Sequence, residues 1–596
     1  MRNRLKYLLL LVPLILAIGV YFYWLAKPLP KKDMAQYVPE NAALYIQVDE
    51  LSSLLTGLIQ TQAWQKLAPV LGISDQLNYL GSTVDTLAKT GLGPDEAVLL
   101  ARAQYALFVD GLTAETQPDD SSAKTTATPA LEIVPQLALV IETQADSAKV
   151  EKILTSRMSL LARRLYGADV IIKDQSYQNI ACHYFSAPNN PRQLVAAHKD
   201  SIIIIGNNDR SIKACLDVLL HQKSRLSDNA YLQEARRQLL SNGKAEVFAY
   251  ISGQTIAHSW QFLGLFLSAK YGSDTLELSQ KVSEQLIDGL AYSSHFQEGQ
   301  VLEDYYLLVK PDFAQSLQTV IQPTTESITA LKPILDLAKE FICLRVQKPA
   351  QTLEALVASI AARNNVVVSF ALRQLLINNG RHYGIDPKNP IGDLLGDDLL
   401  LIKLAAIDQA GFAIVLAVKD KASMLPTVGR YLRPAGGQVR SENYQNVEII
   451  HSTDDANRAG AFIGDYLVLG TSEQIMALID GQHGATKTAK SKLYSTINTY
   501  KQAFIISSKP DKLAVAEFML AISQLLRTTD GAKSLLNNDQ VKEAIESLPP
   551  TLTTTQFIDN KIIWQTRSNL GLFSLASLLL NREEELHEYQ KPTMGK

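Results

Sequence analysis

Hydrophobic positions along this chain form one long uninterrupted run near the start and many short, interrupted runs afterwards. The long run, residues 7–26, contains no charged side chain and follows the basic residues Arg2, Arg4 and Lys6. At about 1.5 Å per residue, a helix of this length spans the roughly 30 Å hydrocarbon core of a bilayer. An aromatic cluster at 21–24 ends the run and suits the membrane–water interface. The pattern predicts an uncleaved transmembrane anchor.

Two alternatives to an anchor remain open, a cleaved signal peptide and a buried core helix. A signal peptide usually has an apolar region of about 7–15 residues that ends in a small-x-small cleavage site. The candidate site here, Ala17 and Gly19, lies inside the run. A large portion that follows a first hydrophobic segment normally translocates. We therefore expect a single-pass membrane protein with residues 1–6 in the cytoplasm and a periplasmic or cell-surface body.

The rest of the chain repeats one order of hydrophobic patterns, which indicates an internal duplication. Strand-like and helical segments recur in pairs, the first-half member given first: 43–48 with 341–346, 51–67 with 351–362, 95–100 with 397–402, 137–141 with 412–416, 211–220 with 473–479 and 301–309 with 562–567. The closest matches in letters are YQNI at 177–180 with YQNV at 444–447, and DSIIIIG at 200–206 with DYLVLG at 465–470.

One polar stretch accounts for most of the length difference between the two copies. Residues 115–129 (ETQPDDSSAKTTATP) are rich in Ser, Thr, Pro and Asp, a composition that cannot bury a core. They predict a disordered insertion at about 112–130, in a loop between two strands.

Strands that alternate with amphipathic helices and end in hairpins predict an α+β fold class. We expect an N-terminal transmembrane helix followed by two duplicated α+β domains, whose antiparallel sheets are covered on one face by helices. The expected division is a cytoplasmic N-terminus at 1–6, an anchor at 7–26, a linker at 27–35, a first copy at 36–310, a connector at 311–335, a second copy at 336–580 and a polar tail at 581–596. Apolar helices at 256–269 and 572–580 are expected to pack on the sheets, with a membrane contact as the alternative.

Several of these segments are similar to the bacterial Domain of Unknown Function 3352 family. The resemblance rests on VPENAALYIQV at 38–48, on GIDP at 384–387 running into LLGDDL at 394–399, and on the strands that end at Gly206 and Gly470. It would cover most of residues 36–570. The resemblance implies a membrane-anchored protein of the bacterial envelope. It assigns no catalytic or ligand residue, because the family has no assigned activity.

Composition excludes some classes of function. A net charge of −3 and a pI near 6.3 argue against a nucleic-acid binder, which would carry a basic face. Three cysteines in a chain of 596 residues do not make a disulfide framework. Cys215 and Cys343 lie in apolar patterns and are predicted to be small buried side chains, whereas a bond between Cys182 and Cys215 remains an alternative.

The sequence offers no catalytic, cofactor-binding or metal-binding residue, and we expect no cofactor. Phosphate-binding, nucleophile-elbow and zinc-protease motifs are missing from it, and the nine histidines lack metal-ligand spacing. Ser121 and Lys124 form a Ser-x-x-Lys within the predicted insertion, where no base would be held in place. The acidic pairs at 95–96 and 397–398 are predicted to end turns and to keep strand edges solvated, rather than to act as acids, bases or cation ligands.

The expected function is therefore a non-enzymatic binding or scaffold role in the bacterial envelope. The expected partners are the membrane, through the N-terminal helix, and an envelope protein, lipid or polymer, with no nucleic acid. The alternatives are a hydrolase or other enzyme with its site in the cleft between the two copies, and a purely structural spacer.

Overall fold

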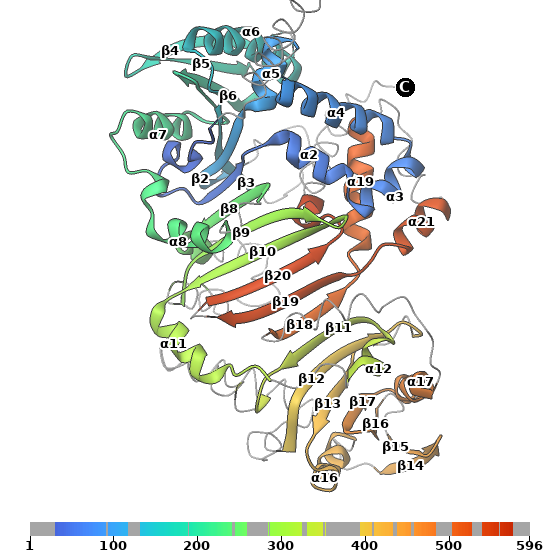
Figure 1. Cartoon of the computed structure of the whole chain (residues 1–596). Helices are drawn as coiled ribbons and strands as arrows, with labels where there is room; N and C mark the ends of the chain where they lie inside the picture. The colour runs from blue at the N-terminus through green and yellow to red at the C-terminus, as the bar shows by residue number, and fades with distance from the viewer. Residues whose placement is uncertain are drawn as a thin grey trace, which may run out of the picture.

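The structure is a computed structural model of the whole chain (Figure 1). It describes residues 30–90, 93–116, 131–167, 169–188, 190–240, 245–258, 280, 284, 286–324, 331–349, 352, 394–407, 411–432, 438–453, 458–483, 503–526, 539–558 and 561–575. Described strands belong to one sheet of 20 strands, in which each pairing is antiparallel.

The first half of the chain supplies ten of these strands. They are β1 (Leu44–Val48), β2 (Gln104–Thr116), β3 (Leu131–Glu142), β4 (Ile171–Tyr177), β5 (Ile180–Ala187), β6 (Asn190–Lys199), β7 (Ile202–Gly206), β8 (Val247–Ser252), β9 (Ile287–Gln297) and β10 (Gln300–Val309). Its helices are η1 (Met34–Tyr37), α2 (Leu51–Ile59), α3 (Gln62–Leu71), α4 (Ser74–Thr90), α5 (Asp95–Arg102), α6 (Ser147–Tyr166), α7 (Asp209–Leu219), η2 (Leu226–Asp228), α8 (Ala230–Leu239) and α11 (Pro311–Val320).

The second half supplies the other ten strands. They are β11 (Ala338–Arg345), β12 (Leu395–Leu404), β13 (Ala413–Val418), β14 (Val439–Tyr444), β15 (Val447–Ser452), β16 (Ala459–Ile463), β17 (Tyr466–Gly470), β18 (Ala503–Lys509), β19 (Thr551–Ile558) and β20 (Lys561–Ser568). Its helices are α12 (Lys332–Leu335), α16 (Lys421–Leu432), α17 (Ser472–His483), α19 (Lys512–Leu526), α21 (Asp539–Glu546) and η4 (Gly571–Leu575).

The second half repeats the strand pairing of the first half strand by strand. From the outer edge inwards, the first half runs β4-β5-β6-β7-β3-β2-β1-β8-β9-β10. The second half runs β14-β15-β16-β17-β13-β12-β11-β18-β19-β20. Each strand of the first half therefore has its counterpart ten strands later in the chain.

The two halves meet where β10 pairs with β20, in the middle of the sheet (Figure 1). This pairing runs from Val301 opposite Ser568 to Leu307 opposite Ile562. Each strand is the second arm of a hairpin, and the two hairpin registers make Asp304 equivalent to Gln565. These two residues face each other, and Gln565 Nε2 donates to Asp304 Oδ1 at 2.6 Å. A local two-fold axis therefore passes between them.

Helices cover both faces of the outer part of each half. In the first half, α6 packs with Ile203 and Phe185 on one face, and α7 packs with Ile202 and Ile204 on the other. In the second half, α16 and α17 take the corresponding opposite faces. Strands enclosed on both sides have continuous apolar sequences, as β7 does, because neither face meets water. The expectation that helices cover only one face is thus wrong here.

A third core, formed by helices of both halves, reinforces the junction. Trp64 and Leu67 of α3 pack with Val515 and Met519 of α19 and with Val541 of α21. Lys66 Nζ also donates to the Ser547 backbone oxygen across this contact, at 2.8 Å. The halves are consequently joined by side-chain packing as well as by the β10–β20 ladder.

The predicted fold class needs two corrections. The α+β assignment with antiparallel pairing agrees with the structure, but one continuous sheet replaces the separate sheets expected for two domains. Within the described ranges, no helix combines the length and the apolar character needed to cross a membrane, so the predicted transmembrane helix is not supported. Residues 7–26, on which that prediction fell, lie outside the described ranges.

Three local predictions also differ from the structure. Residues 95–100 form helix α5 rather than a strand, because two acidic residues at its N-terminus favour a helix through its dipole. The predicted insertion begins too early, since β2 runs to Thr116 and pairs there with Leu131. The single helix expected at 51–67 is divided into α2 and α3, and Thr61 caps the second of these.

Other predicted segments lie outside the described ranges in whole or in part. They are 351–362, 384–387, most of 256–269, the Ser-x-x-Lys at 121–124, residues 576–580 and the polar tail.

The matching YQN sequences form equivalent turns, β4 to β5 and β14 to β15. Gln178 and Asn179 both have positive φ (51° and 67°), as do Gln445 and Asn446 (48° and 66°). Paired positive φ angles match the right-handed twist of a tight hairpin, and Asn tolerates them better than most residues. The repeated letters therefore reflect backbone geometry that both hairpins need.

We predict that Asn446→Ala raises the hydrogen-exchange rate of the β14–β15 amides about fivefold, because a left-handed Ala costs about 1 kcal/mol. Asn446→Gly is the matched control and should leave the rates near those of the native chain. Peptide-resolved hydrogen exchange checks both variants. Equal rates in Asn446→Ala and Asn446→Gly would contradict the role given to this turn.

Candidate functional site

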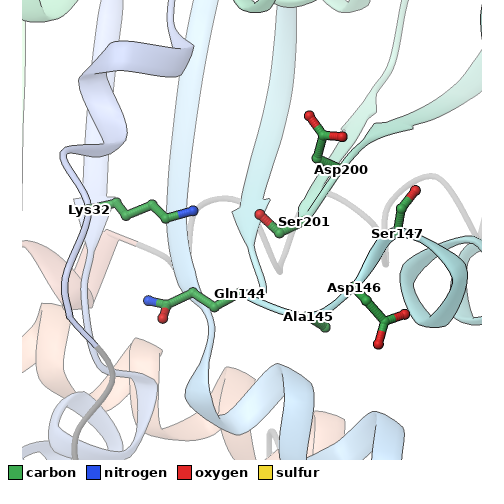
Figure 2. A pocket seen from close by; sticks show the side chains of 7 residues that line it. All are labelled: Lys32, Gln144, Ala145, Asp146, Ser147, Asp200 and Ser201. Carbon is green, nitrogen blue, oxygen red and sulfur yellow. The ribbon is translucent and has the colours of Figure 1, made fainter.

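A pocket at the end of the first-half sheet is the candidate site for a small ligand (Figure 2). It is open to solvent, has a volume of about 310 Å³, and lies between the N-terminal segment, the start of α6 and the turn from β6 to β7. Its lining residues are Lys32, Gln144, Ala145, Asp146, Ser147, Asp200 and Ser201. The pocket thus presents one cation, two carboxylates and two hydroxyl groups.

Lys32 and Asp146, two of the charged groups at this pocket, are engaged with the fold. Glu142, at the end of β3, is fully buried and accepts hydrogen bonds from Lys32 Nζ (2.9 Å), from the Tyr37 hydroxyl (2.7 Å) and from the Gln144 backbone N–H (2.9 Å). Asp146 caps α6 by accepting from the Lys149 backbone N–H at 2.9 Å. Lys32 is therefore neutralised by Glu142, and Asp146 is used as a helix cap.

Burial alone would raise the pKa of the Glu142 carboxyl. Hydrogen bonds from Ser201, Tyr37 and Lys32 stabilise the carboxylate more strongly and lower this pKa below its ordinary value of 4.5. Burial and the neighbouring Glu142 charge raise the pKa of Tyr37, which keeps its hydroxyl a proton donor. The arrangement holds a carboxylate in place as an acceptor and leaves it no proton to transfer near neutral pH.

The same cluster fastens the N-terminal segment to the sheet. The Lys32 backbone N–H donates to the side-chain Oε1 of Gln104 at 2.7 Å, and Gln104 Nε2 donates to the Lys32 backbone oxygen at 3.0 Å. Asp33 pairs with Arg236 of α8 at 2.7 Å, and Gln144 Nε2 donates to the Pro30 backbone oxygen at 2.8 Å. The chain is thus anchored to the body from residue 30 onwards.

A second buried carboxylate, Glu303, lies on β10 beside the junction of the two halves. It accepts from the Tyr292 hydroxyl (2.9 Å), the Leu572 backbone N–H (2.8 Å) and the Ser568 hydroxyl (3.3 Å). Burial raises the pKa of Glu303, and these donors offset part of that rise. A Cβ at Gly571 would approach its carboxylate within 2.5 Å, so η4 closes directly over it.

The sequence predicted a cleft between the two copies as the place for an alternative enzyme site. At this junction the described residues are packed together and leave no such cleft. The β10–β20 ladder, Glu303 and the stacked rings of Tyr305 and Trp564 (5.2 Å between centroids) fill the position. Glu303 is only 3% exposed, so substrate has no approach to this carboxylate in the structure. Its hydrogen-bond donors come from both halves of the chain, so this carboxylate joins the two halves.

The acidic pairs differ from their predicted role. Asp95 and Glu96 lie on α5 and form ion pairs with Lys149 and Arg157 of α6. Asp398 lies within β12 opposite Arg345 and accepts from its Nε at 2.8 Å, and both side chains are buried. The prediction of a solvated strand edge is therefore wrong for Asp398, because Arg345 on the paired strand compensates the buried charge.

An acidic residue on the following helix clasps each YQN turn. In the first half, the Tyr177 hydroxyl donates to Asp217 of α7 at 2.7 Å, with Gln178 Nε2 at 3.3 Å. In the second half, Tyr444 and Gln445 donate in the same way to one oxygen of Asp480 on α17, at 2.9 and 2.6 Å. Both copies therefore use the same hydrogen bonds to attach the outer hairpin to a helix.

The cysteines and histidines provide no further site among the described residues. Cys182, Cys215 and Cys343 are free and buried, which confirms the prediction for the last two, and the structure has no bond between Cys182 and Cys215. His183 contacts Asp174, and His451 contacts Ser472. No group of three or more His, Cys, Asp or Glu side chains in the described ranges is arranged to hold a metal ion.

Sequence reasoning missed the two buried carboxylates that organise these regions. Glu142 ends the apolar strand sequence LALVIE, and Glu303 interrupts the apolar pattern of β10. An acidic residue within or at the end of an apolar strand is the available signal, because a buried charge needs partners.

Comparison with known proteins gives one match. The family model "Protein of unknown function (DUF3352)" matches residues 381–506, which include β12 to β17. This match confirms, within the second half of the chain, the resemblance predicted from the sequence. No curated protein and no solved structure matches the chain.

We predict that acid loosens the N-terminal segment through Glu142. A lowered pKa in the folded state means that this stabilisation is present above the ordinary value of 4.5 and is lost as the pH falls through the lowered value. Glu142→Gln should therefore speed hydrogen exchange at residues 34–38 near neutral pH, and the difference from the native chain should disappear in acid. The ratio of the two rates at each pH removes the intrinsic pH dependence of exchange. A ratio that stays constant across the acidic range would contradict this role.

Proposed function

We propose that this chain is a non-enzymatic binding or scaffold protein of the bacterial envelope. One observation carries the proposal, namely the β10–β20 pairing that fuses two repeats into a single sheet. With strands about 4.8 Å apart, 20 strands extend roughly 90 Å along the sheet. A long, rigid sheet suits a protein that holds partners at a distance or along a surface.

The chemistry of the described polar clusters supports a binding role over catalysis. Glu142, Glu303 and Asp398 are each buried and hydrogen-bonded to groups that stabilise the fold. Catalysis of hydrolysis needs a nucleophile or activated water beside a base, with a place for substrate. The pocket at Lys32 and Ser201 supplies hydroxyl groups without a histidine among its lining residues.

The envelope location in this proposal comes from the family resemblance, which the match at residues 381–506 supports. The partner class follows from that location: an envelope protein, a lipid or an envelope polymer. A scaffold of this kind would act through its exposed faces and through the outer strands, β4 and β14.

We predict that a photoreactive residue on either outer strand captures a discrete partner in intact cells. Gln175 on β4 and Glu442 on β14 are equivalent exposed positions, five and four residues into their strands. Irradiated cells should yield an adduct of defined mass at one or both positions, and non-irradiated cells supply the background. The proposal fails if neither position yields an adduct while the folded chain is present at normal levels.

A further inference from the structure

Helix α6 leaves apolar side chains exposed in its last two turns. Over its first three turns, Val150, Leu154 and Met158 form a buried stripe against the sheet. The same side of the helix continues to Leu161 and Leu165, which lie three and seven residues beyond Met158. These two leucines are 41% and 57% exposed, whereas Ala162 and Tyr166 in the same turns pack on the core beneath α6.

The second copy packs on its part of the sheet with a shorter helix. Its counterpart α16 has 12 residues, against 20 in α6, and its stripe of Met424, Val428 and Leu432 is buried to the last residue. Pro434 and two glycines follow α16 in the sequence, which opposes continuation of a helix. The extension of α6, residues 159–166, is thus a feature of the first copy.

This extension combines exposed apolar and basic side chains. Leu160 is 51% exposed, and Ile171 and Ile172 at the start of β4, five residues after α6 ends, are also exposed. Arg163 and Arg164 lie in the last turn of α6 and are exposed. Neither arginine has an ion-pair partner within the described ranges, whereas Arg157 of the same helix pairs with Glu96.

We propose that the α6 extension, residues 159–166, together with Ile172, docks onto an anionic lipid bilayer. The leucines and Ile172, which is paired with Phe185 on the α6 side of the sheet, would enter the boundary between headgroups and acyl chains, while Arg164 would bind lipid phosphates. Leucines flanked by arginines are typical of helices that lie at a membrane interface. Arg164 has no ion-pair partner within the described ranges, and its free positive charge complements an anionic surface.

This inference deepens the proposed binding function by naming its partner class, and it rests on that function. It can fail separately, because capture of a protein partner at β4 or β14 does not require lipid contact at α6.

The test uses the full-length chain with an environment-sensitive fluorophore on a single introduced cysteine. Leu161→Cys places the probe in the extension, and Lys152→Cys places it on the opposite side of the same helix as the matched control. The native cysteines are buried and do not compete for labelling. Vesicles of phosphatidylglycerol and phosphatidylcholine, or of phosphatidylcholine alone, are added, and brominated acyl chains serve as quenchers.

With phosphatidylglycerol present, we expect the probe at position 161 to shift to the blue, brighten about twofold and be quenched by brominated chains. The probe at position 152 should not change. Arg164→Gln should abolish the shift at position 161. Because flotation of vesicles reports binding by any part of the chain, it is measured in parallel.

Three results would overturn the proposal. The first is a water-like probe at position 161 on protein that floats with anionic vesicles. The second is an equal shift with phosphatidylcholine alone, which removes the role of Arg164. The third is an apolar, concentration-dependent signal before any lipid is added, which would assign the surface to a second copy of the chain.

Discussion

The pairing of β10 with β20 is the constraint on which the rest of the architecture depends. Without it, each half would be a ten-stranded sheet with an inner edge of unpaired backbone groups, which invites association with other chains. The pairing satisfies both edges at once, and it does so symmetrically about Asp304 and Gln565. In this respect the junction resembles the isologous interface of a two-fold dimer whose subunits have become one chain.

Buried carboxylates act as fasteners at the points where separate parts of the chain must stay together. Glu142 holds the N-terminal segment, Glu303 holds η4 against β10, and Asp398 joins β12 to β11 through Arg345. Each has donors that offset the cost of burying its polar group. Their hydrogen bonds show that these three acidic side chains stabilise the fold. What differs between the copies, above all the longer α6, is therefore the better guide to function.

Sequence patterns predicted the repeated elements where hydrophobic runs and turns were distinct. The YQN turns, the strands before Gly206 and Gly470, and the helices that follow them all lie close to their predicted places. The prediction failed where the same composition fits either a strand or a helix. At 95–100, an apolar run behind two acidic residues forms a helix instead of the predicted strand. It also could not show that β10 meets β20, because paired residues such as Asp304 and Gln565 are 261 positions apart in the sequence and leave no local signal. The partners of Glu142 are similarly remote, since Lys32 lies 110 residues before it.

Disulfide formation across the local two-fold axis tests the central claim most directly. The double variant Asp304→Cys with Gln565→Cys places two thiols on directly opposed residues of the β10–β20 ladder, while the native cysteines remain buried. The control, Asp304→Cys with Ile563→Cys, moves one thiol to a diagonal position, where residues lie about 7–8 Å apart and a disulfide is disfavoured. One continuous sheet predicts rapid oxidation of the direct pair and little of the diagonal pair, measured by intact mass under mild oxidation. Equal yields for the two pairs, or no bond in either folded variant, would contradict the fused sheet.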